Sequence, residues 1–221
     1  MIPPRIAEFR FYEELNDFLP AEKRKCSFPF TFKINQTVKD AIESMGVPHT
    51  EIDLILANDK SVDFTYQLIN GDRISVYPVF ESFDIKPLIR LRPEPLRETR
   101  FVLDVHLGKL CKYLRMLGFD TVYRNDLDDV EIVEISLKEH RIILTRDLGI
   151  LKNGLVTHGY WLRSQDSREQ LQEVIRRFQL QHKIRPFHRC TVCNGFVKKV
   201  GKEEIAHLLR ENTKKAFNDF F

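Results

Sequence analysis

Long apolar runs are missing from this chain of 221 residues. No segment approaches the roughly 20 apolar residues that a membrane helix needs, and the N-terminus lacks the basic start and apolar core of a secretion signal. Cysteine is scarce as well, and two of the four cysteines, Cys26 and Cys111, stand alone, which is typical of reduced thiols rather than of a disulfide framework. We therefore expect a soluble, cytoplasmic protein with no membrane partner.

Charge is divided unevenly along the chain. Residues 1–95 contain 12 Lys and Arg against 15 Asp and Glu, a formal charge of −3, whereas the remainder contains 23 against 17, or +6. A basic second half indicates that a polyanion would be bound there. Between the halves, a segment rich in proline and arginine, residues 86–97, breaks any helical period and favours an extended path. We expect four segments: a first domain over 1–85, a linker over 86–99, a second domain over 100–187 and a tail over 188–221.

The first domain shows the order strand, strand, helix, strand, strand. Alternating apolar residues predict strands over 6–12 and 26–34, which would form a hairpin, and further strands over 52–57 and 73–78. Thr37 is a suitable N-cap for a helix that ends at Gly46, and Asn70-Gly71-Asp72 is typical of a turn. This order predicts a small α+β domain of the β-grasp type.

The segment resembles the ubiquitin-like, sulfur-carrier-like module that precedes some nuclease domains, namely the Mut7-C ubiquitin-like domain. The clearest part is Gly71-Asp72-Arg73 followed by Val76-Tyr77-Pro78. A sulfur carrier must end in a free Gly-Gly, but here the chain continues through Val79-Phe80-Glu81. We interpret the module as a docking or substrate-positioning domain, which also gives the chain a surface for a protein partner.

The second domain alternates short apolar strands with helices. Strands are predicted over 101–104, 121–123, 141–145 and 159–163, and helices over 107–117, 128–139 and 169–178. Short links between such elements predict a parallel, doubly wound α/β sheet, whose ligands bind beyond the carboxyl ends of the strands. No Gly-x-Gly-x-x-Gly opens the helix after the first of these strands, which disfavours a dehydrogenase.

Three acidic residues stand where a strand ends or a helix begins: Asp104, Asp129 and Asp147. Carboxylates gathered at one point repel each other unless a divalent cation neutralises them, and Mg²⁺ and Mn²⁺ prefer oxygen ligands. We therefore predict that these residues hold a catalytic metal ion. Alternatives stay open, because Asp147 is also placed as a turn residue, and Asp129 competes with its neighbours Asp126, Asp128 and Glu131, of which Asp128 is a natural helix cap.

Several motifs in this half resemble the Mut7-C RNase domain, a family with a PIN-like fold. They are Phe101-Val-Leu-Asp104-Val-His-Leu-Gly-Lys-Leu, Leu114-Arg-Met-Leu-Gly-Phe-Asp-Thr, Leu144-Thr-Arg-Asp147 and Arg189-Cys-Thr-Val-Cys-Asn194. The resemblance implies a metal-dependent ribonuclease that acts on tRNA or mRNA and uses Mg²⁺ or Mn²⁺. It also implies that Asp104, Asp129 and Asp147 take the places of the family's acidic residues.

Basic residues accompany these acids. Lys109, Lys112 and Arg115 recur every three residues on one helix, so they share part of its circumference. Together with Arg146 and Arg163 they predict a basic rim that binds RNA phosphates. The alternative is that the charges only form the solvated side of the helix.

One cysteine pair, Cys190 and Cys193, has the two-residue spacing of a zinc site. The family resemblance implies a second such pair, which the sequence does not contain after Cys193, so the predicted zinc ribbon is incomplete. His188 or His207 would have to supply the missing ligands; otherwise the pair consists of free thiols.

We predict a metal-dependent ribonuclease with a docking module in front. The alternative is a catalytically inactive module on the same fold that binds RNA or a protein partner without cleaving it.

Overall fold

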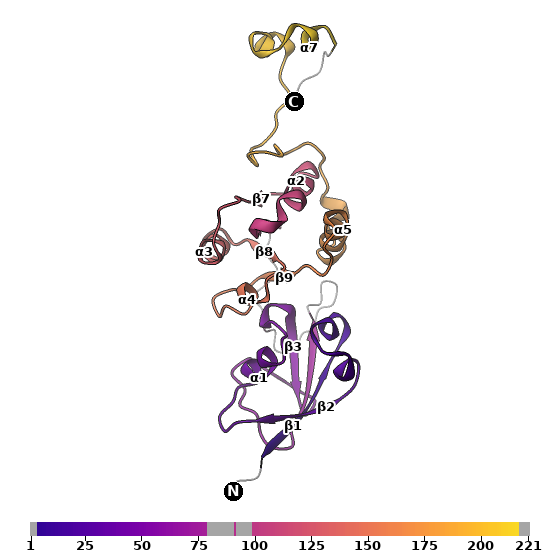
Figure 1. Cartoon of the computed structure of the whole chain (residues 1–221), viewed down its shortest axis with the longest axis vertical. Coiled ribbons are helices and arrows are strands. Elements are labelled where there is room, and N and C mark those ends of the chain that lie inside the picture. Colours follow the sequence, from indigo (N-terminus) through magenta and orange to yellow (C-terminus); the bar gives the residue numbers. More distant parts are fainter. Residues whose placement is uncertain (1–3, 79–90, 92–98, 217–221) are drawn as a thin grey trace.

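The computed structural model describes residues 4–78, 91 and 99–216. A sheet domain lies at one end, an α/β domain follows it, and short helices near the C-terminus lie at the far end (Figure 1). The predicted linker over 86–99 falls almost entirely outside the described residues. Among the residues that are described, no helix is long and apolar enough to cross a membrane.

The first domain is a five-stranded sheet with the order β2-β1-β5-β3-β4. Its strands are β1 (Arg5–Phe11), β2 (Phe28–Phe32), β3 (Ile52–Ala57), β4 (Lys60–Val62) and β5 (Arg73–Pro78). Strands β1 and β5 are parallel and the other pairs antiparallel. The predicted hairpin and the later strands are confirmed. The sequence reading missed β4, a three-residue strand that a tight turn returns against β3.

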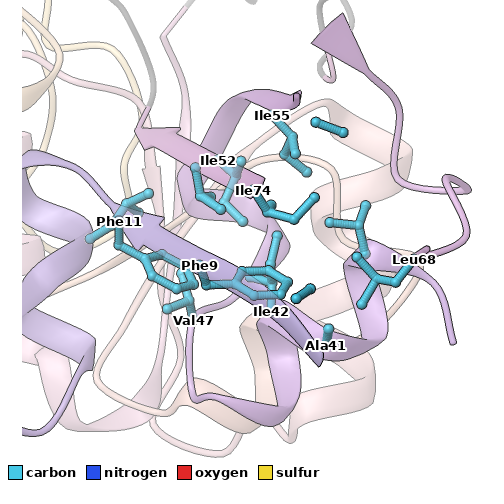
Figure 2. Close-up of a cluster of buried hydrophobic side chains, with 14 of the residues drawn as sticks. Phe9, Phe11, Ala41, Ile42, Val47, Ile52, Ile55, Leu68 and Ile74 are labelled. Atoms are coloured by element: carbon cyan, nitrogen blue, oxygen red, sulfur yellow. The ribbon is translucent and has the colours of Figure 1, made fainter. Parts of the chain in front are cut away.

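One helix, α1 (Val38–Ser44), packs on this sheet. Thr37 caps it, since its hydroxyl accepts a hydrogen bond from the Asp40 amide at 3.1 Å. Alternate residues of β1 point inward, and Figure 2 shows Phe9 and Phe11 among side chains from the helix and the other strands. Three 3-10 helices complete the domain: η1 (Glu13–Phe18), η2 (Ala21–Lys23) and η3 (His49–Glu51).

The second domain has a four-stranded, all-parallel sheet with the order β7-β6-β8-β9. The strands are β6 (Phe101–Leu103), β7 (Thr121–Val122), β8 (Ile142–Thr145) and β9 (Gly159–Trp161). The chain goes outward from β6 to β7 and then returns past β6 to β8, so the sheet is doubly wound, as predicted. The direction of winding therefore reverses between β6 and β8, where such sheets bind their ligands.

Helices cover both faces of this sheet. Alternation along the strands sends Phe101, Leu103 and Leu144 to one face, beneath α2 (Gly108–Met116) and α5 (Ser167–Arg177). Val102 and Ile143 face the other way, beneath α3 (Asp129–Glu139) and α4 (Leu148–Leu151). Two further 3-10 helices, η4 (Val105–Leu107) and η5 (Leu180–Lys183), flank α2 and α5.

The end of the chain carries three short helices, namely α6 (Lys202–Ile205), η6 (Ala206–Leu208) and α7 (Glu211–Ala216). None of them has a buried residue. They lie beyond the α/β domain (Figure 1), so they contribute nothing to its core.

Candidate functional site

Two of the predicted acidic residues lie at the reversal of winding. Asp104 directly follows β6, and Asp147 comes two residues after the end of β8. These strands are neighbours in register, with Leu103 opposite Leu144, and the Asp104 amide donates to the Leu144 carbonyl at 3.2 Å. The parallel pairing therefore brings together two carboxylates that are far apart in sequence.

Thr145 joins the two acids. Its hydroxyl donates to Oδ2 of Asp104 at 2.8 Å and accepts from the backbone amide of Asp147 at 2.8 Å. Thr145 is completely buried and Asp104 is only 7% exposed, so water does not compete for this hydrogen bond. The sequence reading missed Thr145. Its signal was a hydroxyl at the end of an otherwise apolar buried strand, Ile-Ile-Leu-Thr.

Asp147 also opens α4. Its Oδ1 accepts a hydrogen bond from the Gly149 amide at 2.6 Å, which makes it the N-cap of this short helix. The turn role that was left open for Asp147 is thus real. It does not remove the residue from the site, because the side chain stays exposed beside Asp104.

Asp129 is the first residue of α3, and it is exposed. Partial burial raises its pKa, and the negative charges of Asp147 and then Asp104 raise it further. The charges of Asp104 and Asp147 therefore act on Asp129, and Thr145 links Asp104 to Asp147 by hydrogen bonds. A bound cation would relieve the repulsion between these charges.

The neighbours that competed with Asp129 have other partners. Asp128 caps α3 by accepting from the Glu131 amide at 2.8 Å, and Glu131 returns a bond to the Asp128 amide at 3.2 Å, which completes the predicted capping box. Arg124 pairs with Glu131 at 2.7 Å and with Asp126 at 3.2 Å. These contacts favour Asp129 as the third acid of the site.

The donor chemistry fits a hard divalent cation, because three carboxylates share one region and repel each other. The described residues nevertheless contain no group of three His, Cys, Asp or Glu side chains already arranged as a ligand set. One oxygen of Asp104 and one of Asp147 are engaged by Thr145 and Gly149.

Two of the predicted phosphate-binding residues lie free on α2. Lys109 and Lys112 are exposed, whereas Arg115 is only 5% exposed and has a different role. The Arg115 guanidinium donates to the carbonyls of Thr121 at 2.9 Å and Val192 at 2.7 Å. It thus ties the end of α2 to the Cys190–Cys193 loop. The prediction of an RNA contact by Arg115 was wrong, because helical spacing does not reveal that a distant loop covers this side chain.

Arg146 and Arg163 also have partners within the protein, and these partners differ. Arg146 is half-buried and donates to the Ser164 carbonyl at 3.1 Å, next to the carboxylates. Arg163 points to the first domain, where it lies 3.2 Å from Asp17 and 3.9 Å from Glu51. Its charge is neutralised within the protein, so the predicted RNA contact by Arg163 is also corrected.

A groove runs along the exposed side of α2, with a volume of about 1060 Å³. Besides α2 itself, the lining comes from the loop after β7, the start of α5 and the Cys190–Cys193 loop; it includes Lys109, Lys112, Tyr123, Arg124, Ser167 and Val192. The lining carries both signs of charge, because Asp126 and Asp166 lie in it with the basic residues. It includes residues 105–109, which follow Asp104 in the chain.

Two family models match the chain in consecutive order. The Mut7-C RNAse domain model matches residues 99–221, which is more than half of the chain, and the Mut7-C ubiquitin model matches residues 4–84. The chain belongs to the Mut7-C RNase domain family. Membership points to a nuclease-type function with RNA as its substrate. Comparison with curated proteins and with solved structures found no match.

In this Mut7-C domain the cysteine pair forms a tight loop. The Asn194 amide donates to the Cys190 carbonyl at 3.0 Å, and the amides of Cys193 and Val192 lower the pKa of the Cys190 thiol. Among the described residues, no third His, Cys, Asp or Glu joins the pair, and the ring of His188 instead packs edge-on against Phe196 at 5.3 Å. The described part of the chain therefore gives neither His188 nor His207 the role of a zinc ligand.

The loop is held by Asp120, whose carboxylate accepts from Arg141 at 2.7 Å, Asn194 at 2.8 Å and Arg189 at 3.1 Å. Burial alone would raise the pKa of Asp120, but the bonds from Arg141 and Asn194 outweigh it and lower the pKa. Asp120 was part of the Mut7-C motif quoted above, and no role was predicted for it. It connects the loop to the sheet.

Proposed function

We propose that this protein is a metal-dependent ribonuclease that hydrolyses phosphodiester bonds of tRNA or mRNA. The observation that supports the proposal is the pair Asp104 and Asp147, which follow neighbouring parallel strands at the reversal of winding in a Mut7-C RNase domain and whose charges act on Asp129. Ligand sites of doubly wound sheets lie at this position. The ubiquitin-like domain serves as the docking module for substrate or a protein partner.

Asp104, Asp129 and Asp147 would hold Mg²⁺ or Mn²⁺. When bound, such an ion offsets the negative charge that develops on the phosphate and activates a water molecule. Thr145 keeps Asp104 in place from below, and the α4 amide at Gly149 does the same for Asp147. These bonds use one oxygen of each carboxylate.

RNA would follow the groove along α2. Lys109 and Lys112 supply exposed positive charge, whereas Arg124, which also lines the groove, is paired with Glu131 and Asp126. Tyr123, which donates to the Val105 carbonyl at 2.9 Å, presents an aromatic ring to the same groove. These groups bind the backbone without reading bases, so the proposal assigns the RNA class and leaves sequence preference to other contacts.

The test is cleavage of end-labelled RNA by the full chain with Mg²⁺ or Mn²⁺ and with a chelator. We expect cleavage that the chelator abolishes and that the double variant Asp104→Asn Asp147→Asn lacks. Asp126→Asn is the matched control, since Asp126 is exposed nearby but pairs with Arg124. Cleavage by the double variant at the wild-type rate would refute the site.

One observation favours a second candidate function, an RNA-binding module without catalysis. The described residues hold no preformed set of three metal ligands. This candidate predicts that the wild-type chain retains RNA at low salt and cleaves none of it with any divalent ion. Retention would then depend on Lys109 and Lys112 and not on Asp104.

A further inference from the structure

The ubiquitin-like domain contacts the nuclease domain next to the proposed active site. Helix η3 packs against β9, and the ends of the two domains meet near α4 and β9 (Figure 1). The contact is polar at its centre. Glu51 of η3 is fully buried, and its Oε1 accepts a hydrogen bond from the Trp161 amide at 2.7 Å. On the same side, His49 lies between the Glu43 carboxylate at 2.6 Å and the Val156 carbonyl at 2.9 Å.

Trp161 also contacts the turn that carries Asp147. On one side its ring packs against Phe18 of the ubiquitin-like domain, with centroids 5.0 Å apart. On the other side its indole N–H donates to the Arg146 carbonyl at 3.2 Å. Arg146 immediately precedes Asp147, so one side chain contacts both the neighbouring domain and the turn that carries a proposed metal ligand.

Arg163 closes the interface around Trp161. Its guanidinium lies over the rings of Tyr160 at 4.9 Å, Phe18 at 5.5 Å and Trp161 at 5.6 Å. Burial opposes its charge, but Glu51 above all raises the pKa of Arg163, so the guanidinium stays charged. A charged group held between rings and carboxylates fixes both domains in one arrangement.

We propose that the ubiquitin-like domain positions Asp147, and that Trp161 is the positioning residue through which it acts. Glu51 and Phe18 hold Trp161, which holds the Arg146 carbonyl, and the next amide along the chain, that of Asp147, binds Thr145. The kinetic test of this inference rests on the proposed ribonuclease function, because it measures catalysis. The contact itself exists whether or not RNA is cleaved.

A positioning role predicts a specific kinetic effect. Trp161→Phe keeps a ring against Phe18 and removes only the N–H that binds Arg146. Losing one such bond corresponds to roughly a two- to tenfold effect, which we expect in kcat, while KM for RNA changes less than about twofold. A residue with only a structural role would lower the amount of folded enzyme and leave kcat per folded molecule unchanged.

Amide hydrogen exchange tests the same idea without relying on cleavage. In the full chain, Trp161→Phe and Glu51→Ala should speed exchange in the segment 144–151, and α3 should stay unchanged as the internal control. Glu51→Gln keeps an oxygen acceptor for the Trp161 amide but loses the charge that faces Arg163, so its effect on exchange should be smaller than that of Glu51→Ala. Unchanged exchange in 144–151 for both Trp161→Phe and Glu51→Ala would overturn the proposal, even if the enzyme cleaves RNA.

Fluorescence shows whether the contact has been lost. Trp161 is the only tryptophan of the chain, so its emission reports this interface alone. We expect a red shift for Phe18→Ala and Glu51→Ala and a smaller one for Glu51→Gln. A red shift in a variant whose segment 144–151 still exchanges as slowly as in the wild type would show that docking of the domains does not affect the position of Asp147. That result would refute the inference. Absence of RNA cleavage by the wild type, with the expected exchange pattern, would instead refute the proposed function alone.

Discussion

Thr145→Val is the most informative single change in the proposed active site. Valine has nearly the shape of threonine and suits a buried strand, but it has no hydroxyl to donate to Asp104 or to accept from the Asp147 amide. The backbone of β8 should therefore stay in place while Asp104 loses its support. Thr145→Ser is the matched control, because it keeps the hydroxyl and loses only a methyl group.

The expected loss of stability follows from the two bonds. A hydrogen bond to a charged group contributes about 1.5–3 kcal/mol when it is buried, and Thr145 and Asp104 both are. Water can replace the bond to the exposed Asp147, so we count only the first and expect about 2 kcal/mol. Serine should lose about 0.8 kcal/mol, the contribution of one buried methyl group. Valine should thus be the less stable variant by roughly 1 kcal/mol.

Urea unfolding followed by Trp161 fluorescence measures this difference. With a slope near 2 kcal/mol per molar urea, the midpoint for Thr145→Val should fall by about 1 M. The rate of RNA cleavage should fall on the order of a hundredfold, more than the loss of stability alone would cause, because Asp104 is no longer held in place. If Thr145→Val proved at least as stable as Thr145→Ser and equally active, the hydroxyl would have no part in positioning Asp104.

Three other changes test separate features. Asp147→Asn removes a negative charge near Asp129, so carboxyl NMR should show a lower pKa for Asp129, and an unchanged pKa would place the two acids apart. Because the pKa of Asp129 is raised in the wild type, any loss of activity at acid pH should set in above the range of an ordinary aspartate. Gly118→Ala should cost about 2 kcal/mol or more in urea unfolding, since φ is +93° and a Cβ would lie 2.3 Å from a backbone oxygen, whereas Gly154→Ala, with open space around it, should be nearly neutral. Lys112→Ala should weaken RNA binding and reduce the dependence of log K on log salt by about one, as measured by filter binding; an unchanged slope would exclude Lys112 from the groove contacts.

The sequence predicted those parts of the fold that local rules determine. The starts of two helices could be predicted from Thr37 and from the pair Asp128 and Glu131, because the hydrogen-bond partner of an N-cap lies within four residues of it. Apolar alternation located the main strands. Helix α4 and strand β4 escaped prediction, since α4 is a single turn of four residues and β4 has no buried residue to mark it in the sequence.

The candidate site could also be predicted only where local rules determine it. Asp104 and Asp147 followed from the rule that parallel strands end together, whereas Thr145 depends on the register between β6 and β8. Arg115 and Arg163 were misread for a related reason. Besides Thr121, the partners of Arg115 lie 76 and 77 residues later, and Asp17 lies 146 residues before Arg163, so no local pattern could show that these distant groups hold the two charges.

The contact at β9 has one more consequence. Within the described part of the chain, β9 is the last strand of the parallel sheet, and Glu51 accepts a hydrogen bond from its Trp161 amide. An uncovered edge strand is a template for association with other chains. We therefore expect the ubiquitin-like domain to protect this edge, so that a shortened chain that begins at residue 99 aggregates on light scattering where the full chain stays dispersed.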